Sequence, residues 1–213
     1  MNKQKREHQE RVKAQKQAAA ARNKTLIKYG LWAGVVVLAL LLILSFTQNM
    51  GLNIPANNEV ISTDQTKGFK KSPVLLVEYS DFQCPACLTQ HRTIRAAWKD
   101  IRRKVHLVYR HFPLTNIHPH ATLAAHYAEA AGRQDKFWEM HDQLFDNQAT
   151  WAKLDDPSAT FDGYAKTLKL DMAKLETDLA SAELKDKIKA DIASGRDAGV
   201  TGTPTLFING ERL

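Results

Sequence analysis

The sequence predicts an α/β domain in which a helical insertion interrupts a sheet, preceded by one N-terminal transmembrane helix. Three observations lead to this prediction. A short apolar run at residues 74–79, typical of a buried strand, leads into two cysteines at the start of a helix. A second strand is predicted at residues 105–112, after that helix. An uncharged, mostly apolar run of 18 residues at 29–46 lies upstream of both.

The two cysteines of the chain, Cys84 and Cys87, open the helix predicted at residues 85–103. At this spacing their Cα atoms lie roughly 5–6 Å apart, within the range of a disulfide. We expect Cys84 at the cap position and Pro85 at the first helical position. The N–H that proline lacks would have no hydrogen-bond partner within the helix at that position. The free N–H groups and the helix dipole then favour a negative Cys84 sulfur, which is the nucleophilic form. Cys87, one turn further in, suits the resolution of a mixed disulfide.

Two other interpretations of the cysteine pair are less favoured. A structural disulfide that closes a four-residue ring stabilises a fold little. Half of a zinc site needs two further ligands, and the candidates are histidines at no ligand-like spacing. Residues His118, His120, His126 and His141 are spread over a loop and two helices, so we expect surface or core histidines. No metal and no cofactor is predicted.

The charge of the chain is concentrated at its N-terminus. The formal net charge is +7, and residues 1–28, with nine basic and two acidic side chains, account for all of it. The high pI therefore indicates no nucleic-acid binding by the domain. The apolar run at 29–46 is longer than a usual signal-peptide core and no small-x-small cleavage site follows, so we predict an uncleaved signal anchor over a cleaved signal peptide. By the positive-inside rule the N-terminus is cytoplasmic and the domain extracytoplasmic, where disulfides persist.

The predicted organisation has four parts. They are a basic cytoplasmic tail (1–28), a single-pass anchor in the cell membrane (29–46), a linker (47–72), with a small edge strand considered near Ile54 and residues 60–61, and a domain (73–213) with a helical insertion at about 119–198. The strand–helix–strand order predicts a right-handed parallel βαβ unit. Further helices are predicted at 119–131, 134–145, 172–179 (capped by Asp171) and 182–198 (capped by Ser181), and a turn or helix from Asp156-Pro157 through Leu168.

Glu78 interrupts the strand at 74–79 and has two interpretations. It is either a carboxylate turned to solvent at the strand end, or a buried acid beneath the cysteine helix with a raised pKa and a role in proton relay. Further along, Pro204 leads directly into an apolar strand, and Asn209-Gly210 predicts a hairpin turn. A cis bond between Thr203 and Pro204 would let the Thr203 backbone pair with an extended substrate peptide beside the cysteines.

Three motifs together resemble the DsbA-like thiol-disulfide oxidoreductases, over about residues 70–212: Cys84-Pro85-Ala86-Cys87, Glu78 six residues before Cys84, and Gly202-Thr203-Pro204-Thr205 after a helical insertion. Residues 110–114 and 118–121 resemble the second strand and insertion start of the membrane-anchored bacterial branch. The resemblance implies a thioredoxin fold with a helical insertion. It also implies that Cys84 attacks, Cys87 resolves, Pro204 is a cis-proline facing the disulfide and Glu78 is the buried acid. Family members continue past the hairpin with a strand and a helix, whereas the printed sequence ends at Leu213, so we expect a stubby second hairpin strand.

The expected function is a membrane-tethered, extracytoplasmic enzyme that forms disulfides in exported proteins through Cys84 and Cys87, which requires an exposed Cys84 sulfur. A membrane protein or quinone-linked partner would reoxidise the pair. Ala86 stands where the strongest oxidases often carry histidine, which implies a less acidic Cys84, so a reductase or isomerase with the same site is the alternative. Two other classes stay open: a metal-binding module using the cysteines with His111 or His118, and a non-catalytic adaptor whose insertion binds a protein.

Overall fold

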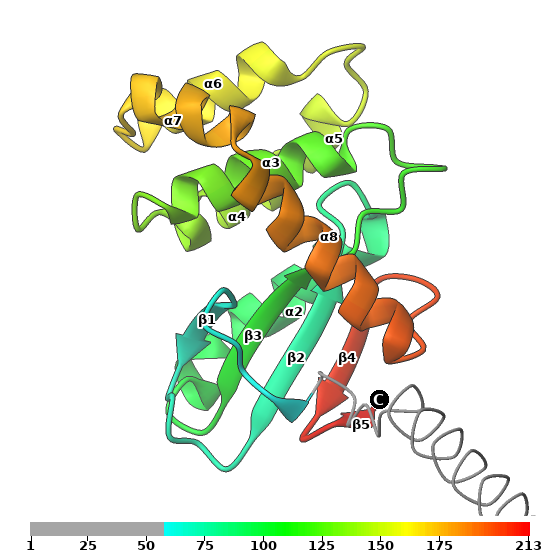
Figure 1. Ribbon diagram of the computed structural model, residues 1–213. Coiled ribbons are helices and arrows are strands. Elements are labelled where there is room, and N and C mark those ends of the chain that lie inside the picture. Colours follow the sequence, from blue (N-terminus) through cyan, green and yellow to red (C-terminus); the bar gives the residue numbers. More distant parts are fainter. Residues whose placement is uncertain (1–57) are drawn as a thin grey trace, which may run out of the picture. The chain divides into compact units, whose positions relative to one another are not determined.

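A mixed sheet of five strands, in the order β1-β3-β2-β4-β5, forms the centre of the region that the computed structural model describes, residues 58–213 (Figure 1). The predicted tail (1–28), the predicted anchor (29–46) and residues 47–57 of the predicted linker lie outside the described residues. The strands are β1 Gln65–Gly68, β2 Leu75–Ser80, β3 His106–His111, β4 Thr205–Ile208 and β5 Glu211–Arg212. None of the described helices is long and apolar enough to cross a membrane.

The predicted βαβ unit is confirmed. Strand β2 pairs in parallel with β3, and helix α2 (Pro85–Ile101) connects them. Strand β4 then pairs antiparallel with β2 on its other side. Strand β2 lies between β3 and β4 and reads as a nearly continuous apolar run, as expected for a strand covered on both faces. Strand β3 is also buried along its whole length, although His106, Arg110 and His111 interrupt its apolar residues.

Strand β1 corrects the predicted boundary of the domain. It pairs antiparallel with β3 at the sheet edge, so the sheet begins before residue 73 and inside the segment assigned to the linker. The edge strand lies at Gln65–Gly68, downstream of the positions considered near Ile54 and residues 60–61. Its sequence, Gln65-Thr66-Lys67-Gly68, is polar and carries no apolar alternation, which explains why the pattern missed it.

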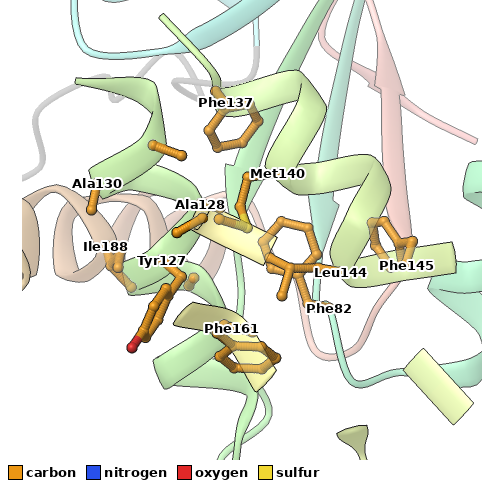
Figure 2. Close-up of a cluster of buried hydrophobic side chains, with 14 of the residues drawn as sticks. Phe82, Tyr127, Ala128, Ala130, Phe137, Met140, Leu144, Phe145, Phe161 and Ile188 are labelled. Atoms are coloured by element: carbon orange, nitrogen blue, oxygen red, sulfur yellow. The ribbon is translucent and has the colours of Figure 1, made fainter. Parts of the chain in front are cut away.

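Between β3 and β4 the chain forms a helical block (Figure 1). Its helices are α3 Ala121–Gly132, α4 Phe137–Asp146, α5 Gln148–Trp151, α6 Ser158–Thr167 and α7 Met172–Ala180, followed by α8 Ala182–Asp197. Side chains from α3, α4, α6 and α8 pack around Met140 and Leu144, and Phe82 reaches the same cluster (Figure 2). The caps at Asp171 and Ser181 are confirmed, since each side chain accepts an N–H bond in the first turn of its helix. Helix α4 starts three residues later than predicted because Asp135 adopts a left-handed conformation with φ of 59°.

Helices α2 and α8 cover opposite faces of the sheet. Ile94 of α2 packs against Leu76 and Leu107, whereas Ile192 of α8 packs against the cluster around Val77 and Val108. Since side chains alternate along a strand, Glu78 and Ser80 of β2 and Tyr109 of β3 face the α2 side with Leu76 and Leu107. The sheet thus directs three polar side chains toward the helix that carries the cysteines.

The turn between β4 and β5 confirms the predicted hairpin. Asn209 and Gly210 have φ of 50° and 88°, the pair of positive values that a two-residue hairpin loop of type I′ requires. Strand β5 has two residues, as expected for the stubby second strand.

Candidate active site

The cysteines lie where the sequence predicts them, at the N-terminus of α2. Cys84 occupies the cap position and Pro85 follows it as the first helical residue. Cys84 retains 6% of its surface and Cys87 none, so Cys84 is the more accessible of two buried thiols. The expectation of an exposed Cys84 sulfur is therefore wrong for this structure: Cys84 lies under a loop from the C-terminal part of the domain.

The two thiols have opposite acidities. The hydrogen bond from the Cys87 thiol is the largest cause that lowers the pKa of Cys84, to about 5, and the backbone N–H groups of residues 86 and 87 contribute to the same effect. Burial raises the pKa of Cys87, and the neighbouring Cys84 raises it further. Cys84 is thus a thiolate at neutral pH, with Cys87 as its protonated donor. This asymmetry arises without a polar side chain at Ala86.

The covering loop contains Thr203 and Pro204, and the peptide bond between them is cis. The Sγ of Cys84 lies 3.4 Å from the Thr203 carbonyl oxygen, across 119 positions of sequence, and donates to it only in the protonated thiol form. The structure thus brings together the two motifs that the sequence identified separately. The Thr203 hydroxyl is buried and has no hydrogen-bond partner among the described residues.

Asp81 fixes the turn between β2 and α2, and the sequence analysis missed it. Its Oδ1 accepts from the N–H of Gln83 at 2.7 Å, and its Oδ2 accepts from the N–H of Leu114 at 2.8 Å. The Nδ1 of His118 lies 2.7 Å from the same Oδ2. An aspartate that binds the N–H two residues later forms an Asx turn, so its place just before the cysteines was a usable signal.

Gln148 supports the same turn from the insertion. Its amide nitrogen donates to the carbonyl oxygens of Phe82 and Cys84, at 2.7 and 2.9 Å. Gln148 is buried on the four-residue helix α5, which the sequence did not predict. No local pattern marks this residue, because its partners lie 64 and 66 positions away.

Glu78 is buried, which agrees with the interpretation as a buried acid and excludes a carboxylate turned to solvent. Its exposed fraction is 3%, and its Oε1 has no hydrogen-bond partner among the described residues. Burial raises the pKa of Glu78 to about 7, while the Ser80 hydroxyl and the Lys67 ammonium group oppose this rise. Ser80 also lowers the pKa of Cys87, so its hydroxyl lies near both groups. Ser80, not identified from the sequence, lies near both the acid and the resolving thiol, and its buried hydroxyl has no hydrogen-bond partner among the described residues.

The histidines that raised the metal question are separated from the cysteines. His118 contacts Asp81, and the ring of His120 contacts the Leu154 carbonyl oxygen at 2.8 Å. His111 pairs with Glu129 at 2.9 Å. His141 is buried between helices, and His126 lies on α3. Among residues 58–213, the side chains that lie close enough together to hold a metal ion are His91, His141 and Asp142, and neither cysteine is among them.

A dithiol at a helix N-terminus, faced by a cis-proline loop and placed beside the central strands of a mixed sheet, defines a thiol-disulfide oxidoreductase of the thioredoxin fold. The family model described as thioredoxin matches residues 61–213. The chain belongs to the thioredoxin family and, within it, to the DsbA-like thiol-disulfide oxidoreductases.

Three similar proteins show the extent of the match. The crystal structure of Pseudomonas aeruginosa DsbA2 is 30% identical, covers 70% of this chain and 82% of its own, and superposes with a TM-score of 0.56. A thioredoxin-like oxidoreductase from Silicibacter pomeroyi has a TM-score of 0.62 at 22% identity, covering 76% of this chain and 88% of its own. A curated relative named Na(+)/H(+) antiporter NhaA 1, from Salinispora arenicola, is 40% identical over 149 residues, which is 70% of this chain. The chain spans 22% of that relative's length.

Proposed function

We propose that the chain is a membrane-tethered, extracytoplasmic oxidase that transfers its Cys84–Cys87 disulfide to exported proteins. The observation that carries this proposal is the low pKa of Cys84, about 5. A thiolate that is stable in the reduced protein makes the corresponding disulfide a stronger oxidant. Against an ordinary thiol of pKa about 8.5, this pKa stabilises the reduced form by about 2.7 kcal/mol at pH 7, equivalent to about 60 mV.

The proposed cycle begins with the disulfide form. A substrate thiolate attacks the Cys84 sulfur, the Cys84–Cys87 bond breaks, and Cys87 leaves with the electron pair and takes up a proton. The second substrate thiolate then attacks the substrate sulfur of the mixed disulfide, and Cys84 leaves as a thiolate. The low pKa of Cys84 favours this departure. The substrate is oxidised by two electrons, and a disulfide-bearing membrane protein or quinone-linked partner restores the Cys84–Cys87 bond.

Glu78 is proposed to exchange the proton of Cys87 during this cycle. A carboxyl group with a pKa of about 7 can both donate and accept a proton at neutral pH. Ser80 lies near both groups and offers a hydroxyl between them. Glu78 is thus a positioning and proton-relay residue in this proposal, while Cys84 and Cys87 perform the exchange.

Thr203 and Pro204 are proposed to receive the substrate chain. The Thr203 carbonyl oxygen lies 3.4 Å from the Cys84 sulfur. In the disulfide form this carbonyl can accept an N–H from an extended substrate chain beside the cysteines. A groove of about 320 Å³ is lined by residues 112–117, Ile192, Arg196 and Thr201. Thr201 precedes Thr203 by two residues in the same loop. Ile117, 68% exposed, adds an apolar contact at this groove for an unfolded peptide.

The tether is proposed from the apolar run at 29–46 and its basic flank, residues 1–28. The relatives named as Na(+)/H(+) antiporters support the tether, since the part of each that matches this chain belongs to a protein named as an ion antiporter. Alkaline extraction of membranes tests the anchor, because an integral protein stays in the pellet. Labelling of reduced Cys84 in intact cells by a membrane-impermeant maleimide tests the compartment. Release by alkali, or labelling of Cys84 that requires lysis of the cells, contradicts this part of the proposal.

The direction of electron flow is tested by the reduction potential of the cysteine pair, measured by equilibration with glutathione. A potential above roughly −200 mV supports an oxidase. A potential near roughly −270 mV makes the protein a reductase that needs a supply of electrons. Absence of a reversible Cys84–Cys87 disulfide contradicts the redox function in both directions, and function that survives Cys84→Ser would favour the adaptor.

A further inference from the structure

Two buried histidines face each other between α2 and α4, away from the cysteines. His91 of α2 and His141 of α4 are 5% and 4% exposed, and their ring centroids lie 5.0 Å apart. Asp142 follows His141 and has a half-exposed side chain. The cluster therefore has a buried floor of two imidazoles and a carboxylate at its outer edge.

The donor atoms of this cluster converge. The Nδ1 of His141 lies 2.9 Å from Oδ1 of Asp142, and the Nδ1 of His91 lies 4.0 Å from the same oxygen. One donor atom of each of the three residues lies within 4.8 Å of the other two. Tetrahedral Zn²⁺ with bonds of about 2.0–2.1 Å separates its ligand atoms by about 3.3 Å. Binding therefore requires rotation of the half-exposed Asp142 side chain and a small shift of the two imidazole rings toward each other.

A second observation concerns the other nitrogen of the His91 ring, which lies near Asp146 while Nδ1 lies near Asp142. The Nε2 of His91 is buried and has no hydrogen-bond partner among the described residues. Oδ1 of Asp146 lies 3.7 Å from this nitrogen, beyond hydrogen-bond range. Buried imidazole nitrogens are normally satisfied by protein, water or a metal, so an unpaired one needs an explanation.

We propose that His91, His141 and Asp142 bind a divalent transition-metal ion, with Zn²⁺ as the reference ion. Two imidazoles and a carboxylate are a ligand set that Zn²⁺ accepts, with a fourth position open to solvent beside Asp142. Bound metal would join α2, which carries the cysteines, to α4 of the insertion. The sequence predicted no metal because His91 and His141 lie on different helices, 50 positions apart, and no short motif links them.

The surrounding charges limit the ligand set to these three residues. Asp146 is engaged by Arg95, whose Nη1 donates to both of its carboxylate oxygens at 2.8 and 2.6 Å. The Lys67 ammonium group lies 4.1 Å from the centroid of the Trp138 ring, close enough to affect His141. This cation opposes a metal ion, so Lys67→Met is expected to tighten binding.

The site is tested on the full chain, purified in detergent, with Cys84 and Cys87 oxidised so that no thiolate competes for zinc. Competition against a chromophoric chelator is expected to give one Zn²⁺ per chain. His91→Gln and Asp142→Asn are expected to weaken binding by at least about 100-fold, as loss of a direct ligand exceeds the 10–100-fold typical of outer-shell changes. His106→Gln is the matched control, because His106 is also buried with an unpaired Nε2 but lies outside the cluster.

Three results overturn the proposal: no zinc retained by the oxidised chain, zinc retained equally by Asp142→Asn and the unaltered chain, or zinc bound only after reduction of the cysteines. Asp142→Asn alters a half-exposed side chain, so loss of folding does not obscure the outcome. The glutathione equilibration is measured on the same samples without metal. Failure of the metal site and failure of the redox function are therefore seen separately.

Discussion

Replacing Cys87 with alanine removes the group that does most to lower the pKa of Cys84. The Cys87 thiol donates to the Cys84 sulfur, and a hydrogen bond to a charged group contributes about 1.5–3 kcal/mol. At 1.36 kcal/mol per unit, its loss raises the pKa of Cys84 from about 5 to about 6–7. The N-terminal backbone of α2 stays in place, so the pKa remains below that of an ordinary thiol.

The matched variant is Cys87→Ser, in which a hydroxyl can still donate to the Cys84 sulfur. We expect its Cys84 pKa to stay closer to 5 than that of Cys87→Ala. Both values are measured from thiolate absorbance near 240 nm and from the pH dependence of alkylation by iodoacetamide. Each variant has one cysteine, so each titration has one assignment.

Equal pKa values in the two variants would show that the donor at position 87 has no part in stabilising the thiolate. A pKa near that of an ordinary thiol in both variants would refute the contribution of the helix N-terminus as well. In that case the thiolate argument for an oxidase fails, whatever the family membership.

Three further predictions concern the acid and the scaffold. In the folded state the pKa of Glu78 is raised to about 7, so between about pH 4.5 and 7 the folded protein holds a proton that the unfolded protein has released. The free energy of unfolding therefore falls by about 3 kcal/mol as the pH rises through this window. Glu78→Gln should abolish that fall, as measured by urea titrations at several pH values. An unchanged pH slope contradicts the burial of this carboxyl. Gln148→Ala removes one hydrogen bond from each of two buried carbonyl oxygens, although that of Cys84 keeps the Leu88 N–H, and should lower the free energy of unfolding by about 1–3 kcal/mol. Gln90→Ala on α2 should change it by no more than about 0.5 kcal/mol. Equal losses in the two variants would exclude the support of the turn by Gln148. Gly195→Ala places a Cβ 2.7 Å from Cδ2 of Phe112 and should cost about 1–3 kcal/mol, while Gly163→Ala on α6, with no atom within 4 Å, should be neutral or stabilising. A stable Gly195→Ala variant would show that α8 can move away from the sheet.

The sequence was most informative where local chemistry constrains the backbone. Pro85 after Cys84 placed the start of α2, and Asn209-Gly210 placed the hairpin. The caps of α7 and α8 followed from Asp171 and Ser181. Each of these features is decided within about four residues, where turn and cap preferences act.

The features that the sequence did not show depend on distant partners. Strand β1 is polar and gains its place through pairing with β3, about 40 positions later. Gln148 acts on carbonyl groups that precede it by more than 60 positions. The burial of Cys84 results from the loop at Thr203, on the far side of the insertion. Side-chain periodicity carries no information about such contacts.

The paucity of cysteine in this chain has a consequence for its own biogenesis. Cys84 and Cys87 are the two cysteines among the 213 residues. The loop at Thr203 that covers them lies more than a hundred positions later, so it is synthesised after them. Within these 213 residues each thiol has the other as its intramolecular partner, so no wrong pairing exists inside this segment. A domain proposed to create disulfides in other chains thus needs no disulfide isomerase to pair its own two cysteines.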